Sequence, residues 1–244
     1  TVLPDEAKTS KAKSEMEAVS KAGVTGVDPL IHVNTLPDGR LFTVRSGLKS
    51  APLASRISQG TINYVEAAAL LESLISSLSS AANVGVFHRE LGPNNVIFLS
   101  ENVLGCKNFG IAQPLGNGLF GDPWFMSPEQ AAGQDPGMAS TIYSLGCLYY
   151  YMVVGLPPFQ DADPTLLLQR HRQEMPTAPS KARPDITLPE SMDAELLKAM
   201  AKDPHKRYPT LSSFMEDLKT AINPEAQTEE SAATIATAPV SVPE

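Results

Sequence analysis

The residues of this chain that could carry out chemistry are concentrated in one stretch near its middle. His88-Arg89-Glu90 is followed at short range by Asn95 and then by Asn108-Phe109-Gly110. Glu90 offers a carboxylate, which can orient a hydroxyl group or accept its proton. Asn95 and Asn108 offer amide oxygens without charge, whereas Mg²⁺ is a hard cation that proteins usually hold through carboxylates. The stretch therefore lacks most of the charges that a metal-assisted transfer reaction needs.

Three further motifs follow in the second half of the chain. They are Ser127-Pro128-Glu129, Gly155-Leu156-Pro157-Pro158-Phe159, and the segment from Lys202 to Thr210 that contains Arg207. Each motif is unspecific alone. Together, their order and spacing after His88 resemble the catalytic core of the bacterial, eukaryotic-like Ser/Thr protein kinases, in the form of a degenerate member or pseudokinase. The resemblance covers roughly residues 11–222 and is strongest from residue 86 onward.

The resemblance implies an α+β, protein-kinase-like fold of two lobes. The β-rich small lobe would be truncated or incomplete, and the large lobe mainly helical. The residues that match architectural positions of the family are His88, Arg89, Phe109, Gly110, Glu129 and Arg207. His88 and Phe109 are expected to stack in the hydrophobic spine that links the lobes. Glu129 is expected to form a buried ion pair with Arg207. Ile97 falls where the family packs an apolar side chain under the adenine ring.

Most catalytic positions of the family are substituted here. The aspartate that orients the substrate hydroxyl is Glu90, which is one methylene longer, and the lysine that touches the transferred phosphate is Gly92. One metal-binding position keeps its Asn95, but the metal-binding aspartate is Asn108. Asp122 replaces a threonine and would set a negative charge near Glu90, where like charges repel. The groups that perform phosphoryl transfer by charge and position are therefore mostly lost.

The nucleotide-binding elements of the small lobe are not recognisable in residues 1–60. No Gly-rich phosphate loop and no strand lysine is found there. Glu15 or Glu17 is a candidate for the ion-pairing glutamate of the family, with a solvated helix face as the alternative. Arg45 is placed near the position that guards the adenine pocket, where a large cation would fill space that ATP needs. Lys107 either supplies a fixed positive charge in place of a metal or extends into solvent. Thr141 replaces an aspartate that braces the catalytic loop in the family.

The segment 111–126 contains no Ser, Thr or Tyr, so no phosphorylation within it can act as a switch. It is instead rich in large apolar side chains, namely Leu119, Phe120, Trp124 and Phe125. These residues are the preferred docking patch for a partner protein. The alternative is that they pack back onto the helical lobe, as large aromatic side chains usually do.

Hydrophobic periodicity predicts the elements that must position these motifs. We expect strands at 30–33, 41–44 and 96–99, and helices at 7–22, 64–82, 143–154, 194–201 and 211–222. Leu36-Pro37-Asp38-Gly39 between the first two strands is typical of a hairpin turn. The predicted organisation is a partial small lobe at 1–57, a helical large lobe at 58–222 and a disordered tail or linker at 223–244.

Composition narrows the class of function. The formal net charge is −8, which argues against binding to nucleic acid. Cys106 and Cys147 lie in apolar surroundings, which favours a reduced, cytoplasmic chain, and we expect no direct membrane span. We expect a catalytically inactive kinase-like domain that acts as a protein-interaction, scaffold or structural subunit, with a protein partner or in a larger assembly. No cofactor is expected. The alternative is an ATP-binding Ser/Thr kinase with weak residual activity, which alone would require ATP and Mg²⁺.

Overall fold

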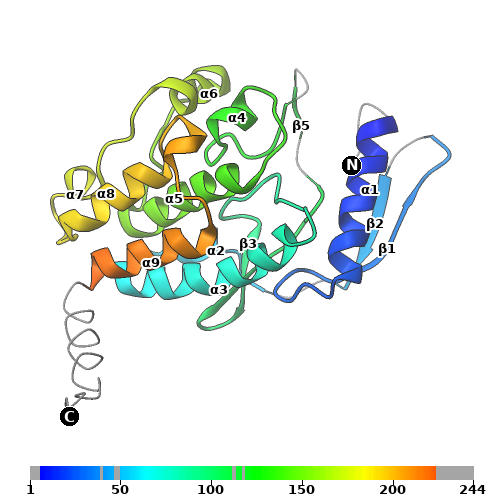
Figure 1. Cartoon of the computed structure of the whole chain (residues 1–244), viewed down its shortest axis with the longest axis horizontal. Helices are drawn as coiled ribbons and strands as arrows, with labels where there is room; N and C mark the ends of the chain where they lie inside the picture. Colours follow the sequence, from blue (N-terminus) through cyan, green and yellow to red (C-terminus); the bar gives the residue numbers. More distant parts are fainter. Residues whose placement is uncertain (1–5, 39–40, 47–49, 112–113, 117–118, 224–244) are drawn as a thin grey trace, which may run out of the picture.

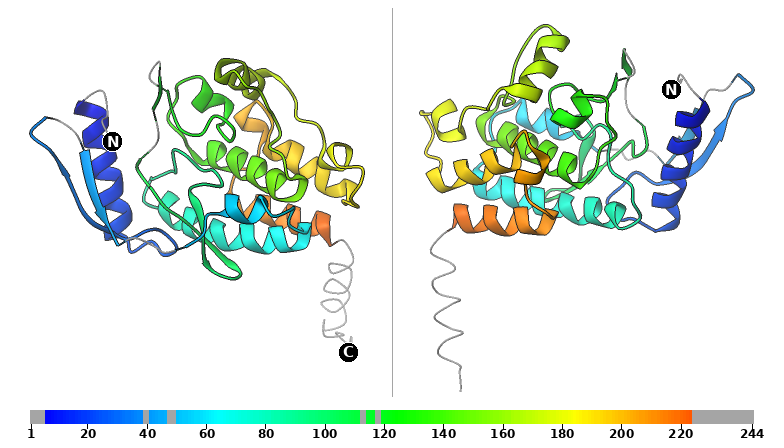
Figure 2. Two further views of the ribbon diagram at one scale, coloured as in Figure 1. Left: turned by 180° about the vertical axis from the view of Figure 1, so that it is seen from behind. Right: turned by 45° about the horizontal axis from the view of Figure 1, so that its top comes forward.

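The computed structural model describes residues 6–38, 41–46, 50–111, 114–116 and 119–223. Its N-terminal part, called the small lobe below, consists of α1 (Glu6–Lys21), β1 (Leu30–Thr35) and β2 (Leu41–Arg45). This part lies beside a larger, mainly helical part, the large lobe (Figure 1). The separation of the α1 and hairpin unit from the helical body is also visible in both views of Figure 2. The arrangement agrees with the predicted α+β, two-lobed fold.

The large lobe begins with the short helix α2 and contains two short hairpins among its helices. Its elements are α2 (Leu53–Ile57), α3 (Tyr64–Ala82), β3 (Val96–Ser100), β4 (Val103–Cys106), β5 (Pro114–Gly116), β6 (Leu119–Phe120), α4 (Pro128–Ala131), α5 (Met138–Val154), α6 (Pro164–Gln173), α7 (Pro179–Ala182), α8 (Glu190–Ala199), a 3-10 turn (Pro204–Lys206) and α9 (Leu211–Ile222). Strands β3 and β4 pair antiparallel, as do β5 and β6.

The small lobe is held together by the pairing of its two strands and by one face of α1. Strands β1 and β2 pair antiparallel, and Val33 lies opposite Thr43 in their register. Val33 and Leu41 are buried against Ala12 and Met16 of α1, forming a small cluster separate from the main core. The apolar residues of a strand recur every second position and those of a helix every three to four, so one face of each element supplies this cluster.

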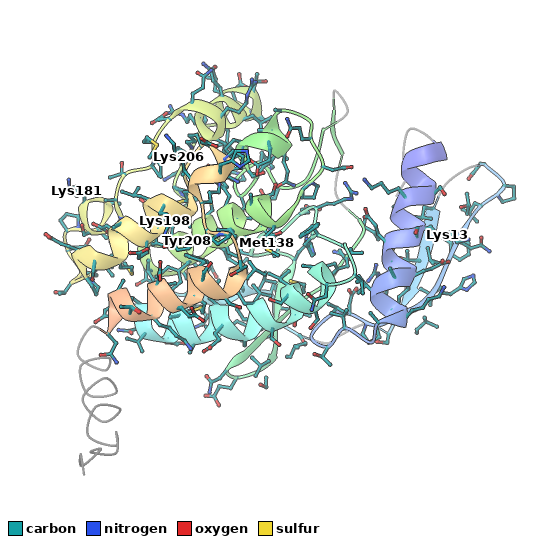
Figure 3. All side chains as sticks on the ribbon, viewed as in Figure 1. Lys13, Met138, Lys181, Lys198, Lys206 and Tyr208 are labelled. Atoms are coloured by element: carbon teal, nitrogen blue, oxygen red, sulfur yellow. The ribbon has the colours of Figure 1, made fainter. Side chains whose placement is uncertain are left out.

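The core of the large lobe is built around α5, which is buried on nearly every side. Helices α3 and α9 pack against one another and against α5. The Asn63 side chain caps α3 by accepting a hydrogen bond from Val65 N, and Gly155 ends α5 in a left-handed conformation (φ 84°). Next to α9, the Lys198 ammonium lies 3.8 Å from the centre of the Tyr208 ring (Figure 3). The large lobe built on this core carries most of the motifs described above.

Helix α3 is long and apolar enough, by length and composition alone, to cross a bilayer. Half of that stretch is buried inside the structure, and the buried residues face the main core. A core helix of a folded domain passes the same test, so the length of α3 carries little weight as a membrane signal.

The predicted elements compare closely with the observed ones where the apolar pattern is long. Helices α3 and α9 have the predicted bounds, and β3 extends the predicted strand by one residue. Helix α5 starts earlier than predicted, and α8 is shifted toward the N-terminus. Helices α2, α4 and α7 were not predicted because they are too short to show a period, and α6 was not predicted because only its Leu167 and His171 are buried. The side chains of Leu53 and Ile57 in α2 already belong to the main core, ahead of the predicted boundary at 58. The predicted tail lies, from residue 224 on, outside the described residues.

Candidate functional site

His88 and Phe109 meet at the centre of the candidate site, as predicted. Their ring centres are 4.7 Å apart in an edge-to-face arrangement, and both side chains are buried. His88 Nε2 lies 2.9 Å from the carbonyl oxygen of Lys107, and its Nδ1 accepts a hydrogen bond from Glu90 N. Burial lowers the pKa of His88 to about 4, with the nearby Arg45 charge acting in the same direction. The imidazole is therefore a neutral structural group at neutral pH.

Asn95 and Asn108 lie together, but their side chains bind one another. Asn108 Nδ2 donates to Asn95 Oδ1 at 2.9 Å, and Asn95 Nδ2 donates to the carbonyl oxygen of Glu90 at 3.0 Å. The amide oxygen of Asn95, the atom that would face a cation, is thus already an acceptor. No cluster of three or more His, Cys, Asp or Glu suited to a metal occurs among the described residues. The residues present therefore do not fit a tightly held Mg²⁺.

Arg45 reaches from β2 into the space behind Asn108-Phe109. It donates to Asp28 Oδ1 at 2.8 Å and to the carbonyl oxygen of Phe109 at 3.0 Å. The same Asp28 oxygen accepts a hydrogen bond from Asn108 N at 3.0 Å. Burial raises the pKa of Asp28, and the Arg45 charge opposes this effect only in part. Arg45 was predicted near the adenine pocket, but its partner Asp28 was missed in the sequence because it belongs to no recognised motif.

The backbone at Asn108-Phe109-Gly110 is unusual. Asn108 has φ 66°, and it is the only described residue other than glycine with positive φ. Gly110 follows with φ 76°, and a Cβ atom there would lie 2.6 Å from Met16 Cγ. Asparagine tolerates the left-handed region better than most residues, and glycine tolerates it fully. The Asn108-Phe109-Gly110 turn is therefore fixed by its own sequence and by direct contact with α1.

Asp122 lies over the position of the lost lysine. A Cβ atom at Gly92 would be 3.0 Å from Asp122 Oδ2 and 3.3 Å from Phe125 Cδ2. Asp122 Oδ1 accepts a hydrogen bond from Trp124 N at 3.0 Å. Burial raises the pKa of Asp122, which that hydrogen bond offsets in part. A carboxyl group, rather than an ammonium group, therefore occupies the space beside Gly92.

Glu129 and Arg207 form the predicted buried ion pair. Arg207 Nη1 donates to Glu129 Oε1 at 2.6 Å, and Nη2 donates to Oε2 at 2.9 Å. Burial alone would raise the pKa of Glu129, but the hydrogen bonds and charge of Arg207 outweigh it and lower the pKa. The pair joins the end of the Ser127-Pro128-Glu129 motif to the turn before α9.

The catalytic-loop segment is braced by Gln130 rather than by residue 141. Gln130 Nε2 donates to the carbonyl oxygen of Arg89 at 3.0 Å. Thr141 Oγ1 instead bonds the Gly137 carbonyl oxygen within its own helix turn. Gln130 was not predicted from the sequence, although it lies next to the recognised Glu129. An amide on α4 thus holds the loop without the charge of an aspartate.

Arg89 is paired with two acidic residues that are distant in sequence. It contacts Glu15 on α1, with Nη2 2.7 Å from Oε1, and Asp135 before α5, with Nη1 2.5 Å from Oδ1. Glu15 was one of two predicted candidates for an ion-pairing glutamate, and the structure places it against Arg89. Asp135 carries no motif, so nothing in the sequence pointed to it.

The remaining candidates are placed as follows. Ile97 is buried in β3, where Pro52 forms a backbone bridge beside it. Lys107 is half-buried, and its backbone N donates to the Asn95 carbonyl oxygen. Phe125 is buried and Trp124 packs against the main core, so these two residues follow the alternative to the docking patch. The side chains of Leu119 and Phe120 lie outside the described residues.

Comparison with known proteins agrees with this geometry. The family model described as "Protein kinase domain" matches residues 4–218. The chain is 33% identical over 173 residues to a probable serine/threonine-protein kinase PknB of Bifidobacterium longum, covering 67% of this chain and 25% of that protein. It is 34% identical over 170 residues to PknB of Mycolicibacterium smegmatis, covering 66% of this chain and 27% of that protein. A probable serine/threonine-protein kinase of Clostridium perfringens is 29% identical over 231 residues, covering 89% of this chain and 33% of that protein.

The chain thus spans about a quarter to a third of the length of these relatives. The matched residues include the motifs that carry the His88–Phe109 contact and the Glu129–Arg207 ion pair. From this match and this geometry, the chain belongs to the protein kinase domain family and resembles the eukaryotic-like Ser/Thr kinases of bacteria.

Proposed function

We propose that this chain is a kinase-family domain that does not transfer phosphate and works as a protein-interaction or scaffold subunit. The observation that carries the proposal is the amide pair between Asn95 and Asn108. Phosphoryl transfer relies on metal ions that neutralise charge developing on the phosphate. Two carboxamides that bind one another supply no negative charge for such a metal.

The surroundings of Gly92 support the same proposal. A lysine at this position would bring positive charge to the transferred phosphate, whereas here Asp122 lies against the glycine. Because the phosphate is itself an anion, the carboxylate form of Asp122 would repel it. Electrostatic stabilisation is usually the largest contribution to catalysis, so the loss of one cation and one metal-binding carboxylate is worth orders of magnitude in rate.

Arg45 gives a third reason. Its guanidinium is engaged by Asp28 and by the Phe109 carbonyl oxygen, so the turn that follows Lys107 is held by a side chain of the protein itself. A nucleotide is not needed to stabilise this arrangement. We therefore expect no ATP and no Mg²⁺ in the working form of the domain, a cytoplasmic location, and partners that are proteins.

The test is a thermal melt of the chain with millimolar ATP, with and without Mg²⁺ or Mn²⁺. A ligand at about 100 times its Kd stabilises a protein by about 2.7 kcal/mol. For a domain of this size, that corresponds to a rise in Tm of roughly 5–10 °C. We expect no metal-dependent rise, and no transfer of labelled phosphate to a protein substrate.

A matched variant makes the negative result informative. Gly92→Lys and Asn108→Asp restore two charges of the family, and Glu90→Asp restores the shorter carboxylate. A phosphorylating kinase domain is measured alongside. A metal-dependent rise in Tm of the unaltered chain would refute the nucleotide-free proposal. Phosphate transfer that Glu90→Ala abolishes would establish the alternative, a weak Ser/Thr kinase that uses Glu90 to orient the hydroxyl group.

A further inference from the structure

The contact between α1 and the large lobe includes charged side chains from the middle of the helix. Val19, near the C-terminal end of α1, packs in the main core, but Ala12 and Met16 pack in the separate small-lobe cluster. The first turns of α1 are therefore not joined to the large lobe through the main core. Apolar packing at Gly110 and Ile111 connects them, and so does a group of four charged side chains, called the latch below: Lys11, Glu15, Arg89 and Asp135.

The inner half of the latch is shielded from water and its outer half is exposed. Arg89 and Glu15 have side chains only 20% and 15% exposed, and they form a two-point contact through Arg89 Nη2 and Nε. Asp135 is 58% exposed and contacts both Arg89 and Lys11. The two cations lower the pKa of Asp135 to about 2, through the hydrogen bond of Lys11 first and that of Arg89 next. Asp135 is therefore a carboxylate at neutral pH. The Arg89–Glu15 contact is the stronger one, because it is less exposed and made at two points.

The latch is linked directly to the candidate site. Gly110 approaches α1 so closely that a Cβ atom there would be 2.6 Å from Met16 Cγ. Arg45 donates to both Met16 Sδ and the Phe109 carbonyl oxygen. The backbone carbonyl of Arg89 is itself held by Gln130. A displacement of α1 must therefore disturb the turn at Asn108-Phe109-Gly110 and the loop that carries His88 and Glu90.

The anions of the latch are built into the chain. Phosphorylation commonly orders a segment by pairing a new phosphate with arginine. The segment 111–126 has no hydroxyl group to receive one. Glu15 and Asp135 instead bring two carboxylates to the guanidinium of Arg89. We propose that these four residues hold α1 closed on the large lobe permanently, without phosphorylation or nucleotide, and that breaking the latch releases α1 with the β1–β2 hairpin as one unit.

Hydrogen–deuterium exchange of the full chain, in the absence of nucleotide, tests this inference. Glu15→Gln removes the inner anion, and Glu17→Gln removes the same charge from the same helix outside the latch. We expect amides of α1, β1 and β2 to exchange about 10- to 100-fold faster in Glu15→Gln, the factor that corresponds to the loss of charge-assisted hydrogen bonds. Asp135→Asn should have a smaller effect because its side chain is more exposed. Amides of α5 and α9 should be unchanged in all three variants.

Equal exchange of α1 in Glu15→Gln and Glu17→Gln would overturn the inference. If Glu15→Gln accelerates amide exchange in α5 as much as in α1, the variant is globally unstable. The inference is then tested on the unaltered chain by raising the salt concentration. Raising NaCl from about 0.01 to about 1 M shortens the screening length from roughly 30 to roughly 3 Å. Salt screens the exposed Lys11–Asp135 pair more than the shielded Arg89–Glu15 pair. Selective acceleration of α1 by salt supports the latch, and no acceleration refutes the part assigned to Lys11 and Asp135. Because nucleotide is left out, this result is independent of whether the domain binds ATP.

Discussion

The Glu129–Arg207 ion pair provides the most quantitative prediction. The Arg207 side chain is 0% exposed and Glu129 is 14% exposed. Besides Glu129, the guanidinium donates to three backbone carbonyl oxygens, those of Ala139, Ala201 and Lys202. Arg207→Met leaves a partly buried carboxylate and three carbonyl groups without their donor. Breaking a buried pair in this way typically costs about 3–5 kcal/mol of unfolding free energy.

For a domain of this size, such a loss corresponds to a fall in Tm of roughly 6–20 °C. Urea denaturation followed by circular dichroism measures the free energy directly, provided that the slope with denaturant is unchanged. The matched control is Lys219→Met, which breaks the exposed Lys219–Glu72 pair, with side chains 48% and 51% exposed. That change should cost less than about 1 kcal/mol. The loss of unfolding free energy in Arg207→Lys should lie between those of Arg207→Met and Lys219→Met, because lysine keeps the positive charge but lacks the planar guanidinium group.

Acid dependence gives the same prediction an independent check. The pKa of Glu129 is lower in the folded chain than its ordinary value of 4.5. Its contribution to stability is therefore complete above that ordinary value and is lost as pH falls through the lower folded value. Arg207→Met should lose this part of the acid dependence. If Arg207→Met costs no more than Lys219→Met, the reasoning that this pair holds the large lobe together is refuted.

Three further predictions concern the candidate site. Gly110→Ala should lower the free energy of unfolding, measured by urea denaturation, by about 2 kcal/mol or more, because it adds a Cβ atom 2.6 Å from Met16 Cγ at a residue with φ 76°. The control is Gly137→Ala, whose Cβ atom meets nothing within 4 Å and should have little effect. The pKa of His88 is about 4, below its ordinary 6.5, so its contribution of roughly 3 kcal/mol is complete above pH 6.5 and is lost as pH falls toward 4. Buried His171, with a pKa of about 3, makes the free energy of unfolding depend on pH in a similar way. His88→Asn should therefore remove only the part of this pH dependence that one proton contributes. An unchanged pH dependence would contradict the lowered pKa of His88. Arg45→Met should lower the free energy of unfolding by about 3 kcal/mol, because it leaves Asp28 buried without its cation. Adding Asp28→Asn should recover part of this loss. Additive effects of the two substitutions would show that the pair is not coupled.

The sequence predicted the elements whose apolar pattern is long. Helices α3 and α9 span several turns of one amphipathic face, so their bounds can be read from the periodicity alone. Helices α4 and α7 are too short for a period, and α6 buries only Leu167 and His171. Each of the three begins with proline at its first or second position, a signal of helix starts. The contact between His88 and Phe109 and the pairing of Glu129 with Arg207 were predicted through resemblance to a family rather than through any local pattern.

The amino-acid sequence by itself determined which chemical groups are present. It shows a carboxylate at Glu90, no cation at position 92 and no acid at position 108, and no folding can restore a charge that the chain does not contain. The tertiary structure decided which groups meet. Asn95 binds Asn108 across the ends of the β3–β4 hairpin, Asp28 holds Arg45 of β2, and Asp135, which follows α4, reaches Arg89. Electrostatic and hydrogen-bond energies depend on distances of a few ångströms, and these distances are set by tertiary packing rather than by separation along the sequence.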